Sequence, residues 1–165
     1  MARVNARVRA KKTATRKVSA RSTARSRKGE KALAKPRRPH KFRINRLREE
    51  DFKRDGLRRY ARYRDLGIED ATHGMAVAHV IRFQGPCDPK QVSKLHKHAA
   101  DFQMIYVLKG SITAQFDGHG VHTVTAGDAW LQPKNIKHKL MNYSDDCEVL
   151  EIVMPADFKT VELEP

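Results

Sequence analysis

The hydrophobic pattern of residues 76–154 is typical of short β-strands. Apolar, β-branched and aromatic residues form eight runs, and turn residues such as Gly110, Gly127 and the "DGHG" segment at 117–120 separate them. Runs at a spacing of roughly 8–12 residues are typical of β-sandwiches and barrels. The predicted strands span 76–83, 92–98, 102–108, 111–116, 121–126, 129–133, 137–143 and 147–154. The pattern predicts an all-β fold with one small core and a cavity in its mouth.

The predicted strand at 102–108 shows how its two faces differ. Successive side chains of a strand point to opposite faces, so Gln103, Ile105 and Val107 lie on one face. We expect that face to line the interior. The other face carries Met104, Tyr106 and Leu108.

The first part of the chain has a different composition. Residues 1–48 hold 19 Lys and Arg against one acidic residue, whereas residues 49–165 hold 15 basic and 18 acidic residues. The net charge of +15 therefore describes the N-terminal part and not the body. We predict a disordered basic tail at 1–39, a linker or docking arm at 40–57, and the β-domain at 58–160.

The basic tail has three possible roles. It can contact nucleic acid or another polyanion weakly and without sequence preference, since no aromatic residue precedes Phe42 to stack on bases. It can equally be a solubilising terminus. Its Arg, Ser and Ala also fit an organellar transit peptide.

No run approaches the roughly 20 apolar residues that span a bilayer, and no apolar signal core opens the chain. The two cysteines, Cys87 and Cys147, form no CxxC pair, and two free thiols are expected. We therefore expect a cytoplasmic protein without membrane contact, or an organellar one if the tail is a transit peptide.

Two of the eight histidines stand out by their spacing. His96 and His98 lie at positions i and i+2, so on a strand their imidazoles share a face and can converge on one metal ion. The pair alone is a weak signal. Of the other six histidines, His138 is discussed next, and the remaining five are expected to be surface or core residues. These five are His40, His73, His79, His119 and His122.

The surrounding residues form two motifs. The first is HxH-x4-Q-x6-G, from His96 to Gly110, and the second is G-x5-P-x-N-x2-H-x3-N, from Gly127 to Asn142. This pair resembles the signature motifs of the cupin superfamily, G-x5-HxH-x3,4-E-x6-G and G-x5-PxG-x2-H-x3-N. The resemblance covers roughly residues 75–155.

The resemblance implies a single jelly-roll β-barrel of the cupin type, often dimeric, so a homodimer is expected. It also implies that His96, His98 and His138 hold a divalent metal, with the position of Gln103 supplying the fourth ligand. Imidazole and carbonyl ligands suit Fe, Mn, Ni, Cu or Zn, so the ligand types do not select the ion.

Three positions depart from the cupin pattern. The opening glycine of the first motif is missing, since the nearest, Gly85, lies eleven residues before His96. Asn135 replaces the glycine of "PxG"; asparagine tolerates a left-handed turn position, so the turn should survive. Gln103 replaces a glutamate.

The glutamine changes the charge of the site. A carboxylate would cancel one positive charge of the metal, whereas an amide oxygen cancels none. Gln103 can be a direct ligand or can orient a water or substrate beside a three-histidine site. Asp101 is another possible ligand, because it shares strand parity with Gln103.

The most plausible function is a metal-dependent enzyme acting on a small organic molecule, with dioxygenase-like chemistry first and a lyase or isomerase next. The alternative is a non-catalytic module that senses a small ligand or metal. The sequence identifies no general base. Glu148 and Glu151 are expected to face solvent, and Trp130, Gln132 and Met141 are only possible neighbours of the site.

Overall fold

The computed structural model describes residues 38–56, 58–92 and 94–163. The tail predicted at 1–39 therefore lies almost wholly outside the described residues. Within them, no helix has the length and apolar character that crossing a membrane requires.

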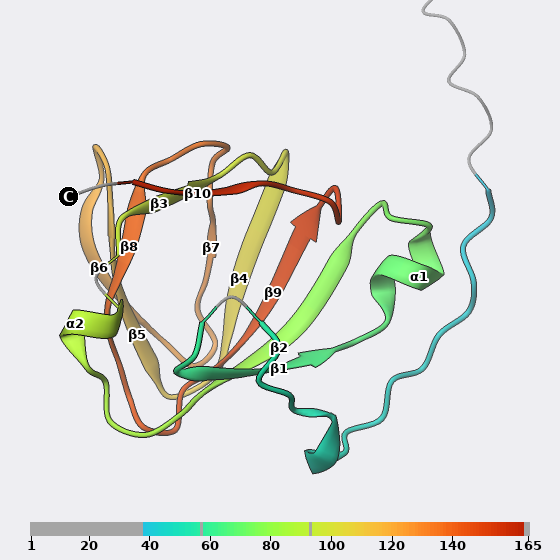
Figure 1. Cartoon of the computed structure of the whole chain (residues 1–165), viewed down its shortest axis with the longest axis horizontal. Coiled ribbons are helices and arrows are strands. Elements are labelled where there is room, and N and C mark those ends of the chain that lie inside the picture. Colours follow the sequence, from blue (N-terminus) through green and yellow to red (C-terminus); the bar gives the residue numbers. More distant parts are fainter. Residues whose placement is uncertain (1–37, 57, 93, 164–165) are drawn as a thin grey trace, which may run out of the picture. The chain divides into compact units, whose positions relative to one another are not determined.

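Two antiparallel five-stranded sheets make up the described body (Figure 1). The first sheet has the order β1-β2-β9-β4-β7, and the second has the order β10-β3-β8-β5-β6. The strands are β1 (Ala61–Asp65), β2 (Val77–Phe83), β3 (His96–His98), β4 (Phe102–Lys109), β5 (Ser111–Phe116), β6 (Gly120–Thr125), β7 (Ala129–Leu131), β8 (His138–Tyr143), β9 (Glu148–Met154) and β10 (Thr160–Glu162). Three short helical segments accompany them: η1 (Glu49–Asp51), α1 (Ile68–Thr72) and α2 (Pro89–Val92). This architecture confirms the predicted all-β jelly-roll fold.

The strand predicted at 92–98 begins only at His96, because a helical turn precedes it. The carboxylate of Asp88 accepts a hydrogen bond of 3.0 Å from the backbone N–H of Lys90. Pro89 occupies the first helical position, where its fixed φ favours a helix. The Asp-Pro pair therefore starts α2, and Val92 packs into the core as a helical residue.

Strands β1 and β10 are absent from the sequence prediction. β1 pairs with β2, although its sequence "ARYRD" contains three charged residues that hide the alternation. β10 pairs with β3 and extends the second sheet at the edge where the paired histidines lie. Both strands depend on partners far away in the sequence.

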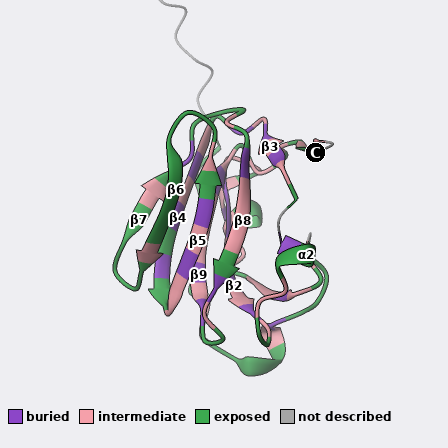
Figure 2. Ribbon diagram, turned by 90° about the vertical axis from the view of Figure 1, so that its left-hand side faces the viewer, coloured by how far each residue is buried: buried purple, intermediate pink, exposed green. Residues whose placement is uncertain are grey.

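The core lies between the apolar faces of the two sheets. On β4, Gln103, Ile105 and Val107 are buried, while Tyr106 and Leu108 are exposed, as the alternation predicted. The buried residues of this core are Ala61, Ile81, Phe83, Val92, Ile105, Val107, Ile112, Tyr143, Cys147 and Val149. On the second sheet, buried positions alternate with partly buried ones along the first part of β5, whereas β6 is almost wholly exposed (Figure 2).

Two turn positions have the left-handed backbone that their residue types suggested. Gly110 alone joins β4 of the first sheet to β5 of the second, with φ of +69°. A Cβ at this position would collide with the side chains of Ser144 and Asp146. Asn135 has φ of 62°, so the left-handed turn expected in the second motif is present.

Candidate metal centre and its cavity

Three histidines converge on the inner face of the second sheet. His96 and His98 come from β3 and His138 from β8, and His96 lies directly opposite His138 in the strand pairing. Their ring centroids are 4.1 Å apart for His96 and His138, 5.0 Å for His96 and His98, and 5.1 Å for His98 and His138. One nitrogen from each ring lies within 4.8 Å of the other two. The three side chains, which we call the histidine trio, could therefore hold one metal ion.

Hydrogen bonds at the Nδ1 atoms orient the trio. Nδ1 of His96 donates to the carbonyl of Lys94 at 2.8 Å, and Nδ1 of His138 donates to the carbonyl of Ile136 at 3.0 Å. Nδ1 of His98 lies 2.8 Å from the hydroxyl of Thr160 on β10. A carbonyl only accepts, so in His96 and His138 the proton sits on Nδ1 and the lone pair on Nε2. This is the arrangement that metal-binding histidines require, and the residues fit a divalent transition metal.

Burial favours the neutral form of all three histidines. It lowers the pKa of His96 to about 3 and that of His98 to about 4, and the positive charges of neighbouring groups act in the same direction. Burial likewise lowers the pKa of His138. Neutral imidazole is the form that binds metals, so the protein environment favours the ligand state near neutral pH.

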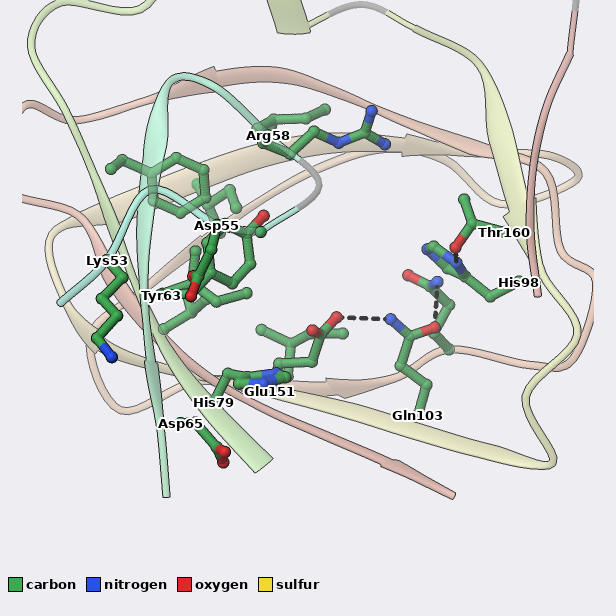
Figure 3. A pocket seen from close by; sticks show the side chains of 18 of the residues that line it. Lys53, Asp55, Arg58, Tyr63, Asp65, His79, His98, Gln103, Glu151 and Thr160 are labelled. Atoms are coloured by element: carbon green, nitrogen blue, oxygen red, sulfur yellow. Dashed lines mark hydrogen bonds between the residues drawn. The ribbon is translucent and has the colours of Figure 1, made fainter. Parts of the chain in front are cut away.

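Gln103 lies beside the trio, on the first sheet, and its amide bridges two other side chains. The amide nitrogen of Gln103 donates to the Glu151 carboxyl at 2.8 Å, and its oxygen accepts from the Gln132 amide at 2.7 Å (Figure 3). The Gln132 nitrogen also lies 3.1 Å from Nε2 of His138. Gln132 therefore contacts the trio directly, and sequence reasoning gave it no role. Asp101, the other possible ligand, is exposed and pairs with Lys134 at 2.5 Å.

Glu151 is the main functional candidate that the sequence prediction missed. The prediction that it faces solvent is wrong: its side chain points into the same cavity as the trio (Figure 3). Burial raises the pKa of Glu151, against the opposing effects of the Gln103 hydrogen bond and the charges of His79 and Arg58. Glu148, the other glutamate of β9, instead forms an ion pair with Arg82 at 2.5 Å.

His79 and Tyr63 complete the wall around Glu151. His79 on β2 lies directly opposite Glu151 in the strand pairing and makes an edge contact with the Tyr63 ring, with centroids 6.1 Å apart. Burial and the nearby Glu151 carboxylate raise the pKa of Tyr63. The first sheet thus contributes a cluster of groups able to exchange or hold protons. Of the five histidines expected to be ordinary core or surface residues, only His79 lines this cavity.

The cavity has a volume of about 780 Å³ and is lined by residues of both sheets. Residues of the segment before β1 line another part of it, including Lys53, Asp55 and Arg58 (Figure 3). The rest of the wall is largely apolar. Trp130 lines it and Gln132 reaches the trio, whereas Met141 does not line it. The volume suits a small organic molecule.

Comparison with known proteins agrees with this geometry. Residues 87–153 match the family model for the cupin domain. This part of the chain is similar to the cupin domain, and the resemblance stated from its two motifs is confirmed. The sequence matches no curated protein.

Several solved structures share the fold. KdgF from Halomonas sp. has 21% identity and a TM-score of 0.53, over 70% of this chain and 94% of that one. The polyketide cyclase RemF from Streptomyces resistomycificus has 18% identity and a TM-score of 0.56, over 74% and 87%. Oxalate decarboxylase from Bacillus subtilis has 19% identity and a TM-score of 0.53, over 69% of this chain but 30% of that one. At these identities the likeness concerns the fold alone.

Proposed function

We propose that this protein is a metal-dependent enzyme that catalyses proton transfer on a small organic molecule, as a lyase or isomerase does. The observation that carries the proposal is the position of Glu151, which lines the same cavity as the histidine trio. A proton-transfer enzyme needs an electrophile and an acid or base near one substrate. The two walls of this cavity supply residues for both roles.

The trio would hold the metal through its three Nε2 atoms. A bound divalent ion supplies Lewis acidity, which polarises a carbonyl or hydroxyl oxygen. Because the neutral histidines and Gln103 cancel none of its charge, the polarisation is stronger than with a carboxylate ligand.

Glu151 would move the proton. Its carboxyl is held by the Gln103 amide at 2.8 Å, so its orientation toward the cavity is fixed before a substrate enters. Burial raises the pKa of Glu151, and a carboxyl with a raised pKa is better suited to giving a proton as well as taking one. His79, opposite on β2, can exchange that proton onward.

The dioxygenase-like chemistry predicted first from the sequence remains the rival, because a metal held by three histidines leaves positions for a substrate and O₂. A protein that binds a ligand without converting it is the third possibility. Measurements of O₂ consumption and of proton exchange distinguish these three functions.

The test begins with elemental analysis of untagged protein, for which we expect about one metal per chain. The metal-loaded protein is then incubated in D₂O with a panel of small 2-oxo and 2-hydroxy acids. Proton NMR follows the loss of the C3–H signals of the 2-oxo acids and of the C2–H signals of the 2-hydroxy acids. An oxygen electrode follows O₂ in parallel.

Exchange of C–H for C–D without O₂ uptake would support the proposal. Glu151→Gln should abolish the exchange while the metal content stays unchanged. Glu148→Gln is the matched control, because it lies on the same strand and faces Arg82, and it should retain exchange. Uptake of O₂ would favour the oxygenase, and binding without either reaction would favour the sensor.

A further inference from the structure

Arg58 lies against the cavity, close to the histidine trio. Its side chain is only 14% exposed, and one guanidinium nitrogen donates to the Glu162 carboxylate at 3.3 Å. Glu162 lies directly opposite His96 in the pairing of β10 with β3. Figure 3 shows the guanidinium extending across the cavity toward the side where His98 and Thr160 lie.

The ion pair with Glu162 does not fully neutralise the positive charge of Arg58. Lys94 approaches the other carboxylate oxygen of Glu162 at 3.9 Å, so two cations share one carboxylate. A guanidinium also has five N–H donors, and Glu162 accepts one of them in the described part of the chain. Half of the Glu162 side chain is exposed, so water weakens its hold on Arg58.

The field of Arg58 reaches both walls of the cavity. Its charge contributes to the lowered pKa values of His96, His98 and His138, and it opposes the rise in the pKa of Glu151. The guanidinium is thus an electrostatic neighbour of the groups at which chemistry is proposed. An anionic group bound there would lie within reach of both walls.

The apolar part of the cavity wall indicates the chemical character of the rest of the ligand. Apolar side chains line much of the cavity, and they include Ile81, Ile105, Ile112, Phe116, Leu140 and Val149. Charged side chains of the segment before β1, such as Lys53 and Asp55, line another part of the cavity. An apolar wall beside the Arg58 guanidinium fits an amphipathic molecule, with one anionic end and one hydrocarbon end. A planar carboxylate matches the geometry of a single guanidinium.

We propose that Arg58 is a carboxylate-binding residue and that the molecule taken by this cavity is a small organic acid with an apolar body. This inference deepens the proposed function and rests on it, since it names the class of substrate for the same site. Arg58 would orient the acid so that its neighbouring carbon faces the trio and Glu151.

The test measures binding of benzoylformate, a small aromatic 2-oxo acid, by titration calorimetry. Its methyl ester is the neutral comparison. Both compounds are titrated into the full chain loaded with Zn²⁺ and into the metal-free chain. The variants are Arg58→Met, Arg58→Lys and Glu162→Gln, and circular dichroism confirms that each is folded.

We expect Arg58→Met to weaken binding of the acid by at least about tenfold and to leave the ester unaffected, with Arg58→Lys recovering part of the loss. Arg59→Met is the matched control, because Arg59 is adjacent, exposed and not part of the cavity wall. Glu162→Gln frees Arg58 from its competitor and should tighten binding of the acid several-fold.

Equal binding of the acid by the wild type and Arg58→Met would overturn the inference, as would equal losses for acid and ester. It would also fail if Glu162→Gln weakened the acid as much as Arg58→Met, since the ion pair would then be structural. A chain that takes up no metal would contradict the proposed function, while the metal-free titrations would still decide the role of Arg58.

Discussion

The two walls of the cavity carry different chemistry. The second sheet presents three imidazoles, with their Nδ1 atoms tied to Lys94, Ile136 and Thr160. The first sheet, together with Gln132 just after β7, presents amides, the carboxyl of Glu151, and the side chains of His79 and Tyr63. The wall from the second sheet therefore presents lone pairs that can bind a metal. The wall from the first sheet presents groups that can hold and move protons.

One physical cause acts on both walls. Burial disfavours charge, so it lowers the pKa of the trio and raises the pKa of Glu151. Both shifts favour the neutral form of these groups. Charge in this cavity comes from Arg58, from side chains of the segment before β1 such as Lys53 and Asp55, and from whatever the site binds.

The largest expected effect comes from removing members of the histidine trio, which forms the wall on the second sheet. His96→Ala combined with His138→Ala removes two of three ligands, and metal affinity should fall by more than about 100-fold. Elemental analysis after dialysis measures the loss. His119→Ala, which changes an exposed loop histidine, should keep the wild-type metal content. Stoichiometric metal in the double variant would place the ion elsewhere.

The histidine wall could be predicted from the sequence because its residues fall in two short motifs. His96 and His98 need only the two-residue period of a strand to share a face, and the cupin pattern supplies His138. The turn at Asn135 and the inward face of Gln103, Ile105 and Val107 follow from local rules as well. Local spacing was sufficient for this wall.

The opposite wall could not be predicted in the same way, because it is assembled by pairing of distant strands. Val149 and Val153 lie at i−2 and i+2 from Glu151, and both are buried. These two apolar neighbours on the same face were the sequence signal that Glu151 points inward. The other face of β9 carries Leu150 and Ile152, so alternation alone does not tell inside from outside. His79 reaches Glu151 only through the β2–β9 pairing.

The next effect concerns the pH dependence of the metal-free protein. The unfolded histidines bind protons below about pH 6.5, whereas burial lowers the folded pKa of His96 to about 3 and of His98 to about 4. The unfolded state therefore binds more protons in this window, and stability should fall as the pH drops from about 6.5 toward 4. The limit is about 1.4 kcal/mol per pH unit for each histidine.

Urea unfolding of the chelated protein at several pH values measures this slope. A variant with His96→Gln and His138→Gln keeps polar side chains of similar reach but cannot take up these protons, so its slope should be shallower. An equal slope in both proteins would mean that other groups control the acid sensitivity, and that the trio is not held neutral by burial.

A third prediction tests Gly110, the one-residue connection from β4 of the first sheet to β5 of the second. Gly110→Ala must place a Cβ at φ of +69° and against the side chains of Ser144 and Asp146. We expect a loss of about 2–3 kcal/mol in the free energy of unfolding. Gly118→Ala has a similar φ of +76° but open space around it, and should cost about 1 kcal/mol. Equal losses would show that the close approach is relaxed without cost.

The smallest effect separates the two glutamines that lie between the walls. Replacing a neutral ligand by a carboxylate cancels one charge of a divalent ion, so the variant whose new carboxylate reaches the metal should bind it about tenfold more tightly. Gln132 has its amide nitrogen 3.1 Å from Nε2 of His138, whereas the Gln103 amide is held between Gln132 and Glu151. We therefore expect Gln132→Glu to tighten binding more than Gln103→Glu.

Competition with a chromophoric chelator measures both affinities, and Gln115→Glu on the exposed face of β5 controls for the added negative charge. In Gln103→Glu the new carboxylate would face Glu151, and repulsion between the two should raise the pKa of Glu151 further. If Gln103→Glu nevertheless gave the larger gain, Gln103 would be the fourth ligand that the cupin motif implies. The first wall would then contribute a metal ligand as well as a proton donor, and the division between the walls would be less sharp.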